Sequence, residues 1–405
     1  MSAPGRPLRR LADLATRPLP VPPDALRRGP FREGRFPSSL HTQRLAAQLG
    51  LWLGISFGVC FLTGLFSHFL QHQPHWATAL PTRPVSFYRM TQGLHVATGL
   101  ASIPLLLAKL WTVYPRLWEW PPARNLAHAV ERGSLFLLVG GATFQLITGL
   151  MNVAGWYAFK FFFTPAHYWT AYITIGALLI HIGAKLATAR AALSRGAGKR
   201  MPDPPRAPGS LSRRGFLTTV GAAAGVVTLA TVGETVGPLS GWSPFAPRRA
   251  SVGPQHLPVN KSAHGARVRD AALDPGYRLQ VVGPGALSLS LAELQALPQH
   301  SVTLPITCVE GWSAVGHWSG VRLRDLLDRA GVAPDRWLRM ESLERGGRYR
   351  TSEVSPGYAR DPLTLVALRL GGAPLALDHG YPCRLIAPDR PGVLQTKWLH
   401  RIVAL

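Results

Sequence analysis

Cysteine is scarce in this chain of 405 residues, which has only Cys60, Cys308 and Cys383. Three thiols so far apart do not predict the disulfide framework that stabilises small secreted domains. Cys60 lies inside an apolar run, where a thiol packs as a small hydrophobe. Cys308 ends a strand-like run and is followed by Glu310 and Trp312. That setting suits a soft-metal ligand or a nucleophile better than half of a disulfide.

Acidic residues are also scarce, because the chain has 20 Asp and Glu against 44 Lys and Arg, a formal net charge of +24. A nucleic-acid partner would require these basic residues on one soluble face. They flank long apolar runs instead, so we expect no nucleic-acid partner. In that position they predict the orientation of membrane spans and an attraction to anionic lipid.

Long apolar runs dominate the chain between residues 45 and 236, and five of them reach the roughly 20 residues needed to cross a bilayer. They are Leu45–Leu70, Met90–Tyr114, Gly133–Ala158, His167–Leu186 and Phe216–Val236. The first, third and fifth contain no Lys or Arg. The sequence therefore predicts five transmembrane helices.

Basic residues in the connectors predict how these helices are oriented, because they concentrate on the cytoplasmic side. One side has the arginine-rich arm up to Arg44, a connector with Arg116, Arg124 and Arg132, and the stretch Lys185–Arg214. The other side has only Arg83, Arg89 and Lys160. We therefore expect a multi-pass protein of the cytoplasmic membrane, with its N-terminus inside and residues after about 240 outside.

The segment Ser212-Arg213-Arg214-Gly215-Phe216-Leu217 precedes the fifth apolar run. It resembles the twin-arginine signal, which exports folded, cofactor-loaded domains. The alternative is that Arg213 and Arg214 are ordinary cytoplasmic flanks of the fifth helix. Both interpretations place the C-terminal part of the chain outside the cytoplasm.

Four histidines in or beside the apolar runs, His41, His95, His167 and His181, are candidate functional residues, because ionisable groups are costly inside a membrane. His167 and His181 are 14 residues apart on one predicted helix. That spacing separates them by roughly 21 Å along the axis and about 40° around it, so they share a face. Depth alone pairs His95 with His167 near the outer surface and His41 with His181 near the inner surface.

This arrangement resembles the membrane b-type cytochrome subunits of formate dehydrogenases and nickel–iron hydrogenases, over about residues 36–190. The resemblance implies two haem b groups, each held by two of the four histidines, and electron exchange with quinone or quinol. We expect that small residues let porphyrin approach the helix backbones, namely Gly93, Gly99, Gly176 and Gly183.

Residues 250–405 mix short strands with helices and predict a small, β-rich α+β domain. Tyr277–Val282, Val302–Thr307 and Arg384–Ala387 have the composition of strands. A capping box of the type Ser-x-x-Glu begins at Ser290 and predicts a short helix. Leucines at helical spacing predict a second helix over Val321–Ala330.

Several ordered motifs in this region resemble those of the sulfite oxidase superfamily of molybdopterin enzymes. They are Gln255-His256-Leu257-Pro258-Val259, Trp318-Ser319-Gly320-Val321, Asp378-His379-Gly380-Tyr381-Pro382-Cys383-Arg384 and Lys397-Trp398. The resemblance implies a Mo-molybdopterin cofactor with the Cys308 thiolate on molybdenum, a soft ligand for a soft metal. It also implies that the pterin is held by His256, His379, Arg384, Gln395 and Lys397.

The residues after Cys308 depart from the sulfite-oxidising pattern, which has Asn-Arg-Arg there. This chain has Val309-Glu310-Gly311-Trp312, which resembles the periplasmic methionine sulfoxide reductase branch. Sulfoxide reduction consumes protons, so we hypothesise that Glu310 is a catalytic proton relay. Gln255 replaces the family's usual Asn, which leaves one pterin contact open. Because no further domain follows Lys397-Trp398, a family-style dimer is not expected, and the oligomeric state stays unknown.

The predicted fold is therefore an α-helical transmembrane bundle, with four haem-binding helices and a fifth anchor helix, followed by a β-rich molybdopterin-binding domain. The expected boundaries are 1–40 for a cytoplasmic basic arm, 41–190 for the di-haem cytochrome, 191–215 for a basic linker, 216–237 for the fifth helix and 238–405 for the extracytoplasmic domain.

The predicted function is electron exchange between the quinone pool, two b haems and molybdenum, with reduction of an S- or N-oxide such as methionine sulfoxide. A sulfite-type dehydrogenase that passes electrons to quinone is the enzymatic alternative. A haem carrier with a mere docking domain, or a bundle that only anchors, are the alternatives from other classes.

Overall fold

The structure is a computed structural model that describes residues 6–20, 36, 38–119, 121–194, 211–249 and 251–405. Most of the predicted arm 1–40 and residues 195–210 of the predicted linker lie outside the described residues. The chain divides into two compact units. The helical unit comprises Met1–Phe61, Thr98–Asn152 and Trp156–Thr228. The β-rich unit comprises Leu62–Ala97, Val153–Gly155 and Leu229–Leu405.

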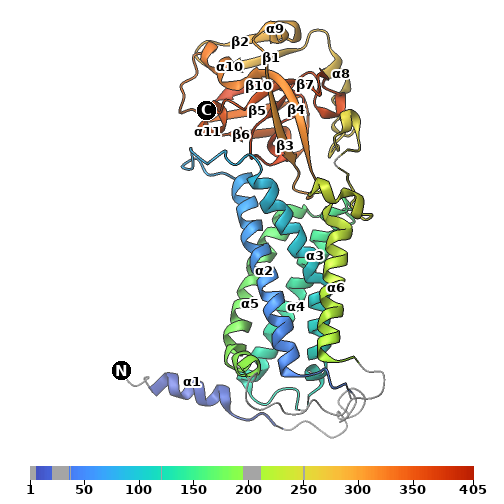
Figure 1. The fold of residues 1–405 in the computed structure, drawn as a ribbon. Helices are drawn as coiled ribbons and strands as arrows, with labels where there is room; N and C mark the ends of the chain where they lie inside the picture. Colours follow the sequence, from blue (N-terminus) through green and yellow to red (C-terminus); the bar gives the residue numbers. More distant parts are fainter. Residues whose placement is uncertain (1–5, 21–35, 37, 120, 195–210, 250) are drawn as a thin grey trace. The chain divides into compact units, whose positions relative to one another are not determined.

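All five predicted apolar helices are present in the described part of the chain and are long and apolar enough to cross a membrane (Figure 1). They are α2 (Gln43–Gln71), α3 (Phe87–Val113), α4 (Leu126–Val153), α5 (Phe163–Ser194) and α6 (Arg213–Val232), preceded by the short α1 (Arg6–Thr16). The ends differ from the prediction on each helix, and most on α5, which is longer than predicted at both ends. Helix α4 stops before Gly155, whose φ of 64° is the left-handed conformation that ends helices. Helix α6 stops at Val232, before the predicted end at Val236.

The helical unit has small buried clusters and broad exposed apolar faces. Leu45, Leu49, Ala108 and Val220 form one of these clusters. Large apolar side chains remain exposed on every helix from α2 to α6, for example Trp52, Leu107, Phe136, Ile180 and Val226. Exposed apolar area of this extent is what lipid-facing helices present, so it agrees with the predicted insertion.

The C-terminal domain contains two five-stranded sheets. The first has the order β2-β1-β10-β5-β6 and joins Leu287–Ser290, Arg278–Val282, Leu399–Ala404, Leu338–Ser342 and Thr351–Val354. Its β1 and β10 are parallel, and its other pairs are antiparallel. The second has the order β3-β4-β7-β8 and joins His300–Thr307, Ser313–Arg322, Leu365–Leu370 and Ala373–Pro374, with β9 (Arg384–Ile386) beside β7.

Short helices connect these strands. The α-helices are α7 (Ala263–Ala266), α8 (Arg269–Leu273), α9 (Leu291–Ala296), α10 (Leu323–Arg329) and α11 (Pro356–Arg360). Single 3-10 turns are η5 (Pro254–His256), η6 (Arg348–Arg350), η7 (Leu377–His379) and η8 (Gly392–Leu394). Two longer 3-10 helices follow apolar helices, η3 (Tyr114–Trp118) after α3 and η4 (Gly237–Trp242) after α6. The predicted capping box is confirmed at Ser290 and Glu293, at the start of α9.

The predicted strands are confirmed, but the predicted helix over Val321–Ala330 is wrong at its start. Val321 and Arg322 are the last residues of β4 and pair with Val366 and Leu365 of β7. The helix α10 begins only at Leu323. A β-branched residue such as Val321 packs well on a pleated ladder, and the sequence pattern alone could not reveal that partner strand.

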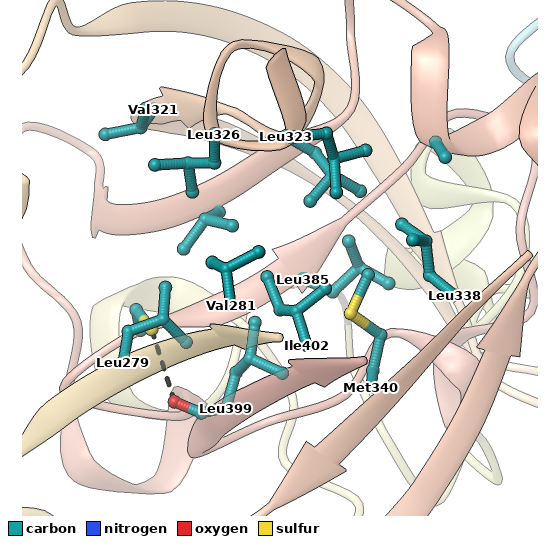
Figure 2. Packing of buried hydrophobic residues seen from close by; sticks show 14 of the residues in the cluster. Leu279, Val281, Val321, Leu323, Leu326, Leu338, Met340, Leu385, Leu399 and Ile402 are labelled. Atoms are coloured by element: carbon teal, nitrogen blue, oxygen red, sulfur yellow. Dashed lines mark hydrogen bonds between the residues drawn. The ribbon is translucent and has the colours of Figure 1, made fainter. Parts of the chain in front are cut away.

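The main core of this domain lies where the apolar face of α10 meets the two sheets (Figure 2). Leu323 and Leu326 of α10 pack with side chains of β1, β5, β9 and β10, namely Leu279, Val281, Met340, Leu385 and Ile402. A second buried cluster contains Cys308, Trp312 and Trp318. This second cluster thus supports β3 and β4, the two strands on either side of the Cys308 loop.

Leu326→Ala should lower the free energy of unfolding of the domain by about 2–5 kcal/mol, because the fully buried side chain would leave a cavity. The matched control is Leu273→Ala, since that leucine is 50% exposed. Denaturant titration of the purified chain measures the difference. Equal midpoints for the two variants would contradict this account of the core.

Candidate active site

Cys308 lies in the loop of the β3–β4 hairpin, between the paired residues Thr307 and Ser313. Its amide donates to the Trp312 carbonyl at 2.9 Å, and its carbonyl accepts from the Gly311 amide at 3.1 Å. Gly311 has a φ of 108°, a conformation that favours glycine. The result is a tight loop whose cysteine is only 1% exposed.

Burial raises the pKa of the Cys308 thiol well above its ordinary value, and the nearby Glu310 charge raises it further. The amide N–H groups of Glu310 and Val309 and the charge of Arg248 oppose this increase. A thiol of this kind stays protonated and unreactive until a metal displaces its proton. The setting therefore favours a metal ligand over a nucleophile.

Cys308 lines a small cavity that communicates with solvent. Its other lining residues are Leu257, Pro258, Val259, Asn260, Ile306, Trp312, His379, Arg384, Gly392 and Lys397. Four predicted site residues, Cys308, His379, Arg384 and Lys397, thus meet around one cavity.

The cavity is strongly cationic. Arg384 is buried and donates to the carbonyls of His379 and Gln395, both at 3.1 Å. Burial lowers the pKa of Arg384 to about 9. Burial, and then the charge of Arg384, lower the pKa of Lys397 to about 7. Burial and mutual repulsion disfavour the charged forms of Arg384 and Lys397, and a phosphate-bearing ligand would stabilise those charged forms.

His379 provides a neutral hydrogen-bonding group at the same wall. Its Nε2 lies 2.6 Å from the Pro254 carbonyl, and a carbonyl can only accept. Nε2 therefore carries the proton and Nδ1 is the acceptor. Burial is the main cause that lowers the pKa of His379 to about 4. A neutral imidazole acceptor suits the N–H groups of a pterin.

Orphaned polar atoms supply the test of whether a cofactor fits. Arg384 Nε and Gln395 Oε1 are buried and have no hydrogen-bond partner among the described residues. Native proteins rarely leave such groups unsatisfied without a ligand or water. The free donor of Arg384 and the free acceptor of Gln395 could hydrogen-bond a polar, anionic cofactor. The buried Cys308 thiol could bind the metal of that cofactor.

Comparisons with known proteins agree with this geometry. The family described as "Oxidoreductase molybdopterin binding domain" matches residues 264–405. Mitochondrial sulfite oxidase of Rattus norvegicus is 34% identical over 161 residues, 32% of this chain and 29% of the relative. Residues 264–405 thus match an oxidoreductase molybdopterin-binding domain, and part of the chain is similar to sulfite oxidase.

Two further proteins are similar to parts of the chain. The Azospira oryzae protein named putative protein-methionine-sulfoxide reductase subunit YedZ1 is 32% identical over 128 residues, 31% of this chain and 48% of the relative. The crystal structure of the Paracoccus pantotrophus sulfane dehydrogenase SoxCD matches 33% of this chain and 40% of that chain, with 23% identity and a TM-score of 0.30. The chain thus spans less than half the length of these relatives.

Three predicted site residues do not line the described cavity of the molybdopterin-binding domain. His256 is exposed. Glu310 accepts hydrogen bonds from Arg248 Nε at 3.2 Å and Trp312 Nε1 at 3.0 Å. Gln395 is buried behind Arg384, which donates to its carbonyl.

Gln255, which replaces the family's usual Asn, has a structural role in the described chain. Its side-chain amide donates to the carbonyls of Leu370 and Pro374, both at 3.0 Å. Its carbonyl oxygen accepts from the Ala376 amide at 2.7 Å. The side chain therefore ties the entry segment to the β7–β8 hairpin.

The loop after Cys308 is held by residues that the sequence analysis did not identify. Gln92 of α3 donates to the Val309 carbonyl at 3.2 Å. Thr235, just after α6, donates its hydroxyl to the Gly311 carbonyl. The Ser313 amide donates to the Glu234 carbonyl at 2.8 Å. All these residues belong to the β-rich unit. Long-range contacts of this kind leave no local signal in a sequence.

Glu234 is the most unusual titratable group beside this loop. The residue is 0% exposed, and neither carboxylate oxygen has a hydrogen-bond partner among the described residues. Burial, and then the charge of Glu310, raise its pKa to about 8. A carboxylic acid in this state is protonated at neutral pH.

The predicted haem ligands are all half-buried, and three of them have a defined partner at Nδ1. His41 Nδ1 lies 3.1 Å from the Thr112 carbonyl, so Nδ1 must be the donor. His95 and His167 have threonine hydroxyls at 3.3 and 3.0 Å. In each case Nδ1 has a hydrogen-bond partner, which leaves Nε2 as the ring nitrogen that could bind iron. Metal-bound histidines usually have such a partner on their other ring nitrogen.

No described group of three or more His, Cys, Asp and Glu residues could hold a bare metal ion. Haem needs only two axial ligands, so this finding does not bear on the predicted haem binding. The predicted pairing of His95 with His167 joins the two units and stays a prediction. Two of the predicted porphyrin-facing glycines have other neighbours, since Gly93 abuts Thr235 and Gly99 faces Cys60.

Lys397→Met should reduce the molybdopterin content of the purified protein by roughly tenfold or more, because one charge-assisted hydrogen bond to an anion is lost. The control is Arg369→Met, which removes an exposed cation on β7. Molybdenum analysis and pterin fluorescence measure the content. Full cofactor content in the Lys397 variant would contradict its assignment.

Glu234→Gln should flatten the pH dependence of stability. The folded state holds the Glu234 proton up to pH about 8, whereas an unfolded chain releases it near its ordinary value of 4.5. The free energy of unfolding therefore falls as pH rises through this window. Thermal unfolding from pH 5 to 9 should show a weaker decline in the variant, with Asp335→Asn as the exposed control. Parallel curves for Glu234→Gln and the parent chain would refute the assigned protonation.

Proposed function

We propose that this chain is a membrane-bound molybdenum oxidoreductase that exchanges electrons between the quinone pool, two b haems and an extracytoplasmic molybdopterin site. The match to a molybdopterin-binding domain supports the molybdenum site, and the five apolar helices support the location in a membrane. The match to an oxidoreductase family argues against a mere docking domain. The basic connectors support a cytoplasmic N-terminus, and the Arg213-Arg214 segment supports export of the C-terminal domain.

The observation that carries the proposal is the contact between α3 and the cysteine loop. Gln92 donates to the carbonyl of Val309, the residue directly after Cys308. His95 lies one helical turn further along α3, and Val96 packs beside Gly311. All belong to the β-rich unit. A haem held by His95 would therefore be joined to the molybdenum ligand through a short, packed and hydrogen-bonded route.

The residues of the domain have distinct roles in this proposal. Cys308 holds molybdenum, while Arg384, Lys397 and His379 hold the pterin and its phosphate. Bound Mo-molybdopterin supplies two-electron oxygen-atom transfer chemistry. The tight loop and the α3 contact fix the cysteine, and Trp312 forms one wall of the cavity.

The residues beside Cys308 favour reduction of an S- or N-oxide. Glu310-Gly311 stands where sulfite-oxidising members have an arginine pair that holds an anion. Glu310 and Arg248, on and beside the cysteine loop, form an ion pair at 3.2 Å and so largely neutralise each other. A neutral, dipolar oxide fits such a site better than a dianion does. The name of the Azospira oryzae relative supports methionine sulfoxide as a model substrate.

A sulfite-type dehydrogenase is the second candidate, because the identity to sulfite oxidases favours it. Electrons would then flow from molybdenum to the haems and to quinone. The two directions of electron flow can be told apart by the haem spectrum, because an oxide substrate would oxidise the haems and sulfite would reduce them.

Stopped-flow spectroscopy of the purified chain tests both the site and the direction. Pre-reduced haems should be reoxidised by methionine sulfoxide in the parent chain and in Cys60→Ala, and not in Cys308→Ala. Haem reduction by sulfite in the oxidised protein would favour the second candidate. Reoxidation that persists in Cys308→Ala would mean that electrons leave elsewhere.

A further inference from the structure

The tripeptide Thr-Gly-Leu occurs three times in the apolar helices, beginning at Thr63 on α2, Thr98 on α3 and Thr148 on α4. Two copies lie against predicted haem ligands. Thr63 Oγ1 is 3.3 Å from His95 Nδ1, and Thr148 Oγ1 is 3.0 Å from His167 Nδ1. Each pair lies within a single unit of the structure. The third copy has a different neighbour, because the Cβ position of Gly99 faces Cys60.

The hydroxyl of Thr148 determines which way its hydrogen bond to His167 runs. Thr148 donates its single proton to the Phe144 carbonyl at 2.7 Å, within its own helix. Its oxygen must therefore accept from His167, so Nδ1 carries the ring proton and Nε2 the lone pair. The Thr112 carbonyl imposes the same tautomer on His41. Gln145 also donates to the His167 carbonyl at 2.7 Å and so fixes the backbone at this residue.

The glycine of each pair leaves room for the imidazole edge. A Cβ at Gly64 would lie 2.8 Å from His95 Cε1 and 3.2 Å from His95 Nδ1. A Cβ at Gly149 would lie 3.6 Å from His167 Cε1, which is an ordinary contact. The ring of His95 is thus packed against bare backbone, whereas the ring of His167 has slightly more space.

We propose that the pairs Thr63-Gly64 and Thr148-Gly149 position His95 and His167 as haem ligands and set the reduction potentials of their haems. This inference rests on the haem binding in the proposed function. The Thr148 oxygen accepts from the ring N–H of His167, and the same direction at Thr63 and His95 is part of the proposal. Such a bond would make each imidazole a stronger donor at Nε2 and stabilise ferric iron. The glycine lets the ring reach that oxygen without displacing it.

Potentiometric titration of the b haems in the purified full-length chain tests the threonines. Thr148→Val and Thr63→Val should each raise the potential of one haem. Loss of the hydrogen-bond partner of a metal ligand typically costs roughly tenfold or more. A tenfold loss in the preference for ferric iron corresponds to about 59 mV for a one-electron couple. Thr148→Ser keeps the hydroxyl and should restore the parental potential. Thr98→Val is the matched control and should leave both potentials unchanged.

The glycines give an independent prediction that a general packing defect would not reproduce. Gly64→Ala must push the His95 ring aside and should change the electron paramagnetic resonance signal of one low-spin haem or remove that haem. Gly149→Ala should have a smaller effect, because its methyl group fits. Gly58→Ala on α2, which meets nothing within 4 Å, is the control.

The possible outcomes separate the inference from the proposed function. A parent chain without b-haem bands contradicts the proposed function itself. Two b haems whose potentials do not change in Thr148→Val and Thr63→Val overturn only the inference. If Thr148→Val loses a haem, its retention in Thr148→Ser supports the role of the hydroxyl, and its loss in both variants refutes it.

Discussion

The burial of the Cys308 thiol in a tight hairpin loop is the constraint on which the rest of the site depends. A loop at a strand end is ordinarily exposed and mobile. Here the loop is only 1% exposed at its cysteine, and three contacts from outside the hairpin hold its backbone. Gln92 bonds to Val309, Thr235 bonds to Gly311, and the Glu234 carbonyl accepts from Ser313. The loop that carries Cys308 is therefore held by residues at the ends of the apolar helices.

In the proposed function, the same contacts would join the electron-delivering part and the molybdopterin-binding part within one chain. A separate electron carrier would have to dock on the molybdopterin-binding domain for every transfer. In this chain α3 belongs to the same polypeptide as the molybdopterin-binding domain, and its Gln92 donates a hydrogen bond to the cysteine loop. The unpartnered acid Glu234 lies in the same short segment that follows α6. Electron delivery and the local protonation state can thus depend on one small group of side chains.

The sequence predicted the apolar helices and much of the cavity, but not the contacts that brace it. Cys308, His379, Arg384 and Lys397 were found because ordered motifs mark them, and they meet at one cavity. His256 was expected there too, but its backbone is left-handed and its side chain is exposed, so its contact with the cofactor stays a prediction. Thr148 beside His167 and Glu234 beside Ser313 depend on which helices and loops become neighbours. Tertiary packing determines these neighbours, and no local pattern in the sequence reveals them.

The central claim is that one polypeptide holds both a molybdenum site and its haem electron supply. Metal and haem analysis of the purified single chain tests it most directly. The account predicts about one molybdenum and about two b haems per chain, with haem absorbance bands that shift on reduction. Molybdenum present without haem iron would contradict it.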